Sequence, residues 1–133
     1  MGLGFDGSAS NDVANVMYEA RQTMLLQRVQ NGADAMSARE ALEIATRGGA
    51  DVLGRPECGR IAVGKRADIA IWDINGIESA GSWDPAALVI AGPNKVRHLF
   101  VEGRQIVRDW HMATLDLPKL IETQNRLALK LAG

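Results

Sequence analysis

Residues 59–73 read GRIAVGKRADIAIWD, and they mark the point where the pattern of the chain changes from helical to extended. Glycines and a basic pair divide the run into two segments rich in β-branched residues, and both segments, 60–63 and 67–73, are predicted to be strands. In the second segment Ile69 and Ile71 share one face, and the opposite face is apolar as well. A strand with two apolar faces is expected inside a sheet rather than at its edge.

Two runs upstream of this stretch have the spacing of a helical face. Residues 12–30 predict the first helix, and side-chain acceptors at residues 10–12 are expected to cap it. Its apolar positions are Val13, Val16, Met17, Ala20 and Met24. Residues 37–47 predict a second helix, which opens with a Ser37-Ala38-Arg39-Glu40 capping box and is expected to end at Gly48-Gly49.

Downstream, the pattern returns to strands and closes with a helix. Residues 95–101 and 104–108 are predicted strands, and the two-residue connection Glu102-Gly103 predicts a β-hairpin between them. Pro85–Ile90 is expected to form one or two helical turns. Residues 118–132 predict an amphipathic helix. The apolar stripe of this helix consists of Leu120, Leu127 and Leu131, with Ile121 beside it.

Composition is that of an ordinary globular domain. The 133 residues are 47% hydrophobic and 23% charged, and 15 basic against 16 acidic residues give a formal net charge of −1. A balance of this kind disfavours binding to nucleic acid. No apolar run is long enough for a membrane span, and the single cysteine, Cys58, fits a reducing compartment, so the sequence predicts a cytoplasmic protein.

Residues with catalytic potential are few. The two histidines, His98 in a predicted strand and His111 after the hairpin, form no metal-ligand pair, and a lone strand histidine is usually a structural residue with a satisfied hydrogen bond. The glycine-rich start, Met1–Gly7, lacks the lysine of a phosphate-binding loop. It reads instead as the end of a strand, with the carboxylate of Asp6 at its tip.

The order and spacing of several short motifs nevertheless form a specific pattern from about Gly2 to Arg108. The motifs are Gly4-Phe5-Asp6-Gly7-Ser8-Ala9-Ser10-Asn11-Asp12, Glu19-Ala20-Arg21-Gln22, Leu25-Leu26-Gln27-Arg28, Ala41-Leu42-Glu43-Ile44-Ala45-Thr46, Gly59-Arg60-Ile61, Gly64-Lys65-Arg66-Ala67-Asp68 and Val101-Glu102-Gly103-Arg104. Together they resemble the C-terminal part of the deaminases of the amidohydrolase superfamily, the branch that includes hydroxyatrazine, 8-oxoguanine, guanine and cytosine deaminases.

The resemblance implies an α/β fold with two parts. Residues 1–56 would supply the last strand and helices of a metal-dependent hydrolase (β/α)8 barrel. Residues 57–110 would form part of a small, composite β-sandwich domain, and residues 111–133 a C-terminal helix. A complete barrel needs roughly 250 residues, so this chain would contribute only its final portion.

The resemblance also implies an activity, the hydrolysis of a carbon–nitrogen bond other than a peptide bond. The expected substrate is a small aminated purine, pyrimidine or triazine, and the expected cofactor is a divalent metal, zinc or iron. Asp6 matches the residue that binds or faces the metal and takes a proton from the attacking water. Ser8 and Asn11 follow it on the loop, where they could contact substrate or, alternatively, cap the next helix.

The other metal ligands and the acidic partner of the family would lie upstream of Met1. The isolated chain is therefore expected to bind no metal and to be inactive. An alternative is that this polypeptide is a non-catalytic, oligomerising or structural module derived from that family. In either case self-association into a homo-oligomer is expected, because part of its apolar surface would face a missing barrel. The residues assigned to that surface are Val13, Val16, Met17 and Met24.

Overall fold

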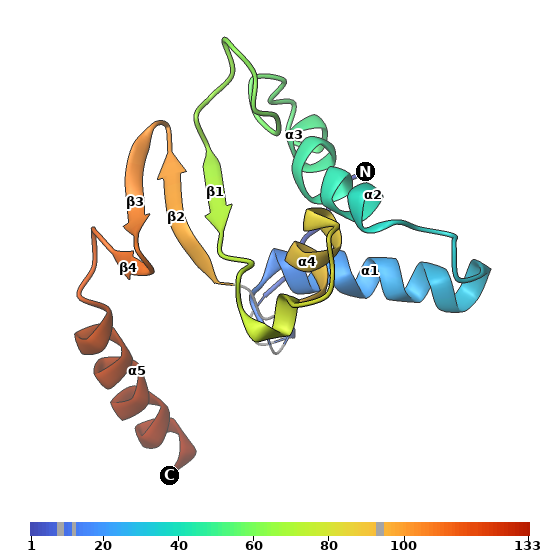
Figure 1. Cartoon of the computed structure of the whole chain (residues 1–133). Coiled ribbons are helices and arrows are strands. Elements are labelled where there is room, and N and C mark those ends of the chain that lie inside the picture. Colours follow the sequence, from blue (N-terminus) through green and yellow to red (C-terminus); the bar gives the residue numbers. More distant parts are fainter. Residues whose placement is uncertain (8–9, 12, 93–94) are drawn as a thin grey trace.

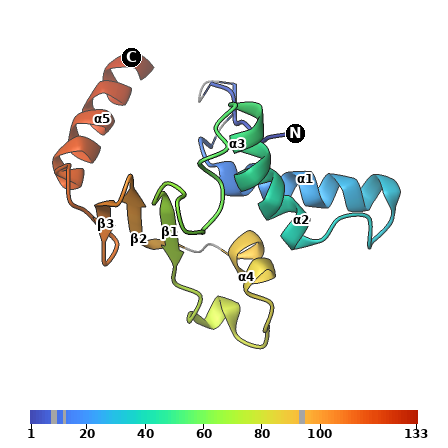
Figure 2. The same ribbon diagram turned by 90° about the horizontal axis from the view of Figure 1, so that it is seen from above.

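The computed structural model describes residues 1–7, 10–11, 13–92 and 95–133 of the chain. Within these residues the sheet lies between a cluster of helices and one outlying C-terminal helix (Figures 1 and 2). The helices are α1 (Val16–Asn31), α2 (Ala38–Glu43), α3 (Gly49–Val52), α4 (Pro85–Ala91) and α5 (Leu117–Ala132). None of these helices is long and apolar enough to cross a membrane.

The sheet has four antiparallel strands that follow one another in sequence order. They are β1 (Ile69–Trp72), β2 (Val96–Val101), β3 (Arg104–Arg108) and β4 (His111–Met112). The strands predicted over 67–73, 95–101 and 104–108 are confirmed. The prediction that the first of them lies inside the sheet is wrong, because β1 pairs with β2 alone among the described residues. An apolar pattern reports the character of a strand's faces, and it does not report how many strands pair with its edges.

The strand predicted over residues 60–63 is also wrong. Ile61 and Val63 are 83% and 106% exposed, and this part of the chain forms turns and bends. Nearby, the backbone N–H of Arg66 donates to the carbonyl of Glu57 at 2.9 Å and closes the loop. β-branched residues favour a strand only where a neighbouring strand receives their hydrogen bonds, and the described residues place none beside this segment.

The predicted hairpin between β2 and β3 is confirmed, with Glu102 and Gly103 as its turn residues. Both have positive φ, 52° and 75°, which is the geometry of the type I′ turn that suits the twist of two antiparallel strands. Glycine adopts this backbone readily, whereas a side chain at the preceding position strains it. The turn therefore forms although only Gly103, and not Glu102, is a residue type that type I′ turns prefer.

A set of polar contacts fastens the loop after α3 to this hairpin. Arg66 pairs with Glu57 at 3.5 Å and also with Glu102 at the hairpin tip. The carboxylate of Asp68 accepts a hydrogen bond from the backbone N–H of Glu102 at 2.7 Å. The pKa of Glu57 lies below its usual value, first because its own backbone N–H donates to the carboxylate and then because Arg55 does. We call Glu57, Arg66, Asp68 and Glu102 the hairpin latch.

The helix predicted over residues 12–30 begins later than expected. Its cap is Asn15, whose side-chain oxygen accepts a hydrogen bond from the backbone N–H of Met17 at 2.9 Å. Capping by residues 10 and 11 is therefore wrong, and Asp12 lies outside the described residues. Several consecutive polar side chains offer nearly equivalent caps in the sequence, and the local path of the loop selects among them.

The second helix begins as predicted and ends later. The capping box is present: the backbone N–H of Glu40 donates to the Ser37 hydroxyl at 3.2 Å, and that of Ser37 donates to the Glu40 carboxylate at 2.7 Å. The prediction that Gly48-Gly49 ends the helix is wrong, because the chain continues through a π-helical turn, Ile44–Gly48, into α3. The glycine pair has a packing role instead, described below.

The core is small and lies where α1, α2 and α4 meet. Its buried residues are Ala20, Met24, Ala38, Ala41, Ala86 and Ile90. Met24 is only 7% exposed and Met17 packs against this cluster, so the expectation that these two face a missing surface is wrong. Val13 remains 44% exposed. Most of the buried side chains are alanines, which lets the helices approach closely.

Candidate functional site

Asp6, the predicted catalytic and metal-binding residue, lies in the N-terminal segment with its side chain exposed. Its backbone is left-handed, with a φ of 55°. Among the described residues, no hydrogen bond or ion pair engages its carboxylate. Aspartate tolerates this backbone better than most residues, and strain of this kind often persists where a side chain must point in a set direction. The carboxylate is thus free to act on a ligand.

Two glycines of the helical run hold the N-terminal segment in place. A Cβ on Gly48 would collide with the carbonyl oxygen of Met1, and a Cβ on Gly2 would lie 3.2 Å from the Cα of Gly49. Leu3 packs against the helical core. The strand predicted to end at this segment is not formed within the described residues, since they place no strand beside it. Backbone-to-backbone packing, rather than a sheet, positions the loop that carries the carboxylate.

Asn11 ties the same loop to α1. Its side-chain amide donates to the carboxylate of Glu19 at 2.6 Å, and its backbone N–H donates to the carbonyl of Gly7 at 3.0 Å. This half-buried amide is therefore engaged within the protein, and it does not cap α1. No hydrogen bond joins Asn11 to Asp6 in the described part of the loop. The other predicted substrate contact, Ser8, lies outside the described residues.

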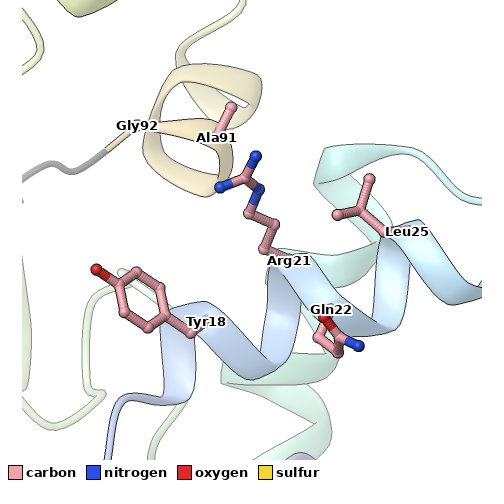
Figure 3. Close-up of a pocket in the computed structure, with 6 residues that line it drawn as sticks. All are labelled: Tyr18, Arg21, Gln22, Leu25, Ala91 and Gly92. Carbon is pink, nitrogen blue, oxygen red and sulfur yellow. The ribbon is translucent and has the colours of Figure 1, made fainter. Parts of the chain in front are cut away.

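A groove between α1 and α4, which the sequence did not reveal, has a volume of about 360 Å³. It is lined by Tyr18, Arg21, Gln22, Leu25, Ala91 and Gly92. Figure 3 shows the guanidinium of Arg21 reaching from α1 toward Ala91 at the end of α4. The four α1 residues recur at the three- and four-residue spacing of one helical face, which is the only signal the sequence offers. With one charged group and no acid–base partner among its lining residues, the groove offers a binding surface rather than catalytic chemistry.

Neither histidine is placed to bind a metal. His98 lies on β2. Its Nδ1 atom is 3.3 Å from the side-chain amide nitrogen of Gln105 and 3.3 Å from the backbone nitrogen of Asp109. The Nδ1 atom of His111 lies 2.6 Å from the carbonyl of Asp109. The interpretation of both as structural residues is consistent with these contacts.

The described residues contain no group of three or more His, Cys, Asp or Glu side chains that could hold a metal ion. Structural and catalytic zinc sites use three or four protein ligands. Asp6 could supply one carboxylate ligand. The other ligands that a zinc site needs are not found in the described part of this chain. The described part of the chain does not fit a complete metal centre.

Comparison with known proteins places this arrangement in context. Residues 1–106 match the sequence model of the Amidohydrolase family. An 8-oxoguanine deaminase from Pseudomonas aeruginosa is 43% identical over 122 residues, a match that covers 91% of this chain and 27% of the relative.

Solved structures agree in fold over nearly the whole chain. An adenosine deaminase from Xanthomonas campestris with bound zinc superimposes with a TM-score of 0.89 at 27% identity, covering 98% of this chain and 31% of that one. The atrazine chlorohydrolase TrzN from Arthrobacter aurescens, complexed with zinc, has a TM-score of 0.82 at 34% identity, covering 91% of this chain and 28% of that one. The chain thus spans between 27% and 31% of the length of these three proteins.

Proposed function

The chain belongs to the amidohydrolase family, and on that premise we propose that it is the C-terminal part of an enzyme that hydrolytically deaminates an aminated nitrogen heterocycle. The observation that carries the proposal is the agreement, in sequence and in fold, with proteins named as deaminases over nine-tenths or more of the chain. Fold alone would not support an activity. Sequence identity of 43% to one such protein supports the activity more directly.

Within that enzyme, residues 1–56 would form the last strand and helices of the barrel. Residues 57–110 would contribute to the smaller sheet domain, and residues 111–133 would follow as its C-terminal helix. The place of β1–β3 within residues 57–110 supports this division, although α4 of the same range packs with α1 and α2 (Figure 1). A loop at the C-terminal end of a barrel strand is where such enzymes carry their catalytic groups, and Asp6 would occupy that position.

Asp6 is proposed to be the chain's contribution to the chemistry. A divalent ion, zinc or iron, would lower the pKa of bound water toward about 7 in the complete enzyme. The Asp6 carboxylate would accept the proton of the attacking water and transfer it to the departing amine, as a general base and then a general acid. The exposed, unengaged carboxylate and its left-handed backbone support this role.

The two other loop residues are assigned different roles. Because the Asn11 amide donates to Glu19, we infer that it positions the loop rather than contacting substrate. Substrate contact by Ser8 remains a proposal from the sequence. Of the three substrate classes considered, a purine is favoured, since 8-oxoguanine and adenosine appear in the names of two relatives.

A second candidate is a non-catalytic oligomerising module. It is favoured by the large apolar side chains that the described surface leaves exposed, among them Val29 at 84% and Leu131 at 90%. The two candidates differ in one measurable respect. Only the first predicts that this chain can supply the missing part of an active deaminase.

The test is a chimera in which this chain replaces the matching C-terminal part of the Pseudomonas aeruginosa 8-oxoguanine deaminase. We expect the chimera to release ammonia from 8-oxoguanine. Asp6→Asn keeps the side-chain shape and removes the base, so the rate should fall by about 10²- to 10⁴-fold. Asp34→Asn, the same change in the loop between α1 and α2, is the matched control and should leave the rate unchanged.

Three outcomes would count against the proposal. A folded, zinc-loaded chimera without activity would favour the non-catalytic module. Full activity in Asp6→Asn would show that the base lies elsewhere. Equal losses in Asp6→Asn and Asp34→Asn would show that the change disturbs folding rather than chemistry.

A further inference from the structure

The C-terminal helix α5 has an apolar stripe that the described residues leave largely uncovered. None of its side chains is buried, and it projects beyond the sheet, away from α1–α4 (Figures 1 and 2). The stripe follows heptad spacing along 16 residues, a length of about 24 Å. Its members are Leu117, Leu120, Gln124, Leu127 and Leu131, with Ile121 and Ala128 alongside.

A helix of this length is marginal in water unless its apolar face is covered. Leu120 and Leu127 are 49% and 47% exposed, so about half of each side chain lies in water. The far face of the helix is mainly polar, with Glu122 and Arg126 among its residues. The sequence pattern of α5 is thus that of a helix with a partner.

A second, independent feature adjoins this helix. Asp109 and Trp110 connect β3 to β4 with positive φ values of 45° and 66°, although neither is a glycine. For a bulky residue such as tryptophan this backbone is a genuine outlier. Arg97 holds the conformation: its guanidinium lies over the indole at 5.2 Å, its carbonyl accepts from the backbone N–H of Trp110 at 3.0 Å, and it pairs with Asp109 at 3.2 Å.

The strained turn presents Trp110, which is 47% exposed, to a groove of about 300 Å³. Leu115, Leu117 and Ile121 also line this groove, so it continues directly into the stripe of α5. Backbone strain that leaves an aromatic side chain at the surface is retained where the side chain has a use. Tryptophan is enriched among the residues that supply most of the binding energy at the centre of protein interfaces.

We propose that the groove at Trp110 and the stripe of α5 together form the surface through which two copies of this chain associate. The two α5 helices lie antiparallel, with the two-fold axis at Gln124. In this register Leu117 faces Leu131 of the second copy, while Leu120 and Ile121 lie level with Ala128 and Leu127 of the second copy. Each copy therefore places its Leu131 beside the groove of the other copy. The two contacts are equivalent, so they form a closed dimer with two-fold symmetry.

The pattern of α5 favours a second copy over an unrelated partner, because its apolar positions are symmetric about Gln124. The one polar member of the stripe meets its own equivalent, and two glutamine amides can hydrogen-bond to each other. No like charges oppose one another across the stripe, since Glu122 and Arg126 lie on the far face of the helix. The surface also lies outside residues 1–106, the part that matches the family model.

The area that a stable interface needs supports including the groove in the proposed surface. A stable interface buries roughly 1,000 Å² or more in total, which is demanding for two helices of two heptads each. A tryptophan can bury roughly 150–250 Å², and each copy contributes one. Including the groove therefore adds one tryptophan from each copy to the area that the stripe buries.

The test uses the 133-residue chain and sedimentation equilibrium at micromolar concentrations. We expect a dimer whose dissociation constant rises about tenfold or more in Leu127→Glu, because the charge would be buried in the interface. Leu129→Glu is the matched control, since the same change on the far face of the same helix should leave the constant unchanged. Val29→Glu on α1 is a second control, and it should also have no effect.

A cross-linking arm tests the register without relying on affinity. In a Cys58→Ser background, Gln124→Cys at the two-fold axis should form an interchain disulfide under mild oxidation, whereas Leu129→Cys should not. A monomeric wild-type chain would overturn the proposal. So would a dimer that Leu127→Glu leaves intact, a dimer disrupted by Val29→Glu, or equal cross-linking at the two cysteine positions. None of these readouts depends on deaminase activity.

Discussion

Glu102 occupies a backbone position that suits asparagine or glycine. It is the first turn residue between β2 and β3, with a φ of 52°, and a left-handed backbone costs roughly 1–2 kcal/mol for most side chains. Its carboxylate pairs with Arg66, while its backbone N–H donates to Asp68. The ion pair is half-exposed and so contributes little to stability. The residue therefore combines a weak favourable contact with a larger backbone cost.

Replacing Glu102 should reveal which effect is larger. Glu102→Asn creates the Asn-Gly pair preferred in type I′ turns and keeps the hydrogen bond to Asp68, so the free energy of unfolding should rise by about 1 kcal/mol. Glu102→Gln is the control: it also removes the charge but keeps the backbone strain, and it should be no more stable than the wild type. Thermal unfolding followed by circular dichroism measures both. If the asparagine variant is less stable than the wild type, the ion pair is the stronger effect.

Residue-level signals predicted one turn and missed the other. Glu102-Gly103 was predictable because glycine at the second position of a two-residue connection indicates a type I′ turn. Asp109 and Trp110 carry no such signal, since a tryptophan with positive φ is rare in any sequence. Contacts with Arg97, which lies on a neighbouring strand, hold that turn.

The helical run from α2 to α3 serves as a platform for the N-terminal segment. Gly48 and Gly49 both have ordinary helical backbone angles, with φ near −60°. Their environments differ, because a Cβ on Gly48 would strike the carbonyl of Met1, whereas a Cβ on Gly49 would meet nothing within 4 Å. Gly48 allows the close approach of Met1, whereas Gly49 has room for a larger side chain.

This difference predicts opposite results for the same substitution. Gly49→Ala should raise the free energy of unfolding by about 0.5–1 kcal/mol, because alanine loses less entropy in a helix. Gly48→Ala should gain nothing, because it must displace the segment that leads to Asp6. Hydrogen exchange should then be faster at the amides of the first seven residues in Gly48→Ala alone. Equal stabilisation by the two substitutions would mean that the segment does not pack there.

At the level of elements, the sequence predicted what local chemistry determines. The capping box at Ser37 and the hairpin strands were correct, since their signals lie within a few residues. Gly48-Gly49 predicts a helix end because glycine usually ends helices, whereas Gly48 in fact packs against Met1, more than 40 residues away in the chain. The strand predicted at 60–63 failed for the same kind of reason, since a strand needs a neighbour that its own sequence does not specify.

At the level of the whole molecule, the sequence located one candidate catalytic group and could not locate the rest of a site. Asp6 was identified from resemblance, and the structure adds its left-handed backbone and exposed carboxylate. The groove at Arg21 and the hairpin latch depend on segments that meet only after folding. A chain that covers less than a third of its relatives also leaves most of their strand ends, and therefore substrate specificity, unspecified.

This incompleteness leads to a prediction about metal binding by the purified 133-residue chain. A zinc site needs three or four protein ligands, and the described residues contain no cluster of three. A single carboxylate in water holds a divalent ion weakly, because the ion must give up tightly bound water for one new contact. Titration calorimetry should therefore show no stoichiometric zinc binding, and Asp6→Asn should change the heat by less than about twofold. The chimera with the upstream barrel should bind zinc with one-to-one stoichiometry or greater and lose affinity on the same substitution. A tight site in the isolated chain that Asp6→Asn abolishes would instead show that this polypeptide assembles its own metal centre, for example between copies.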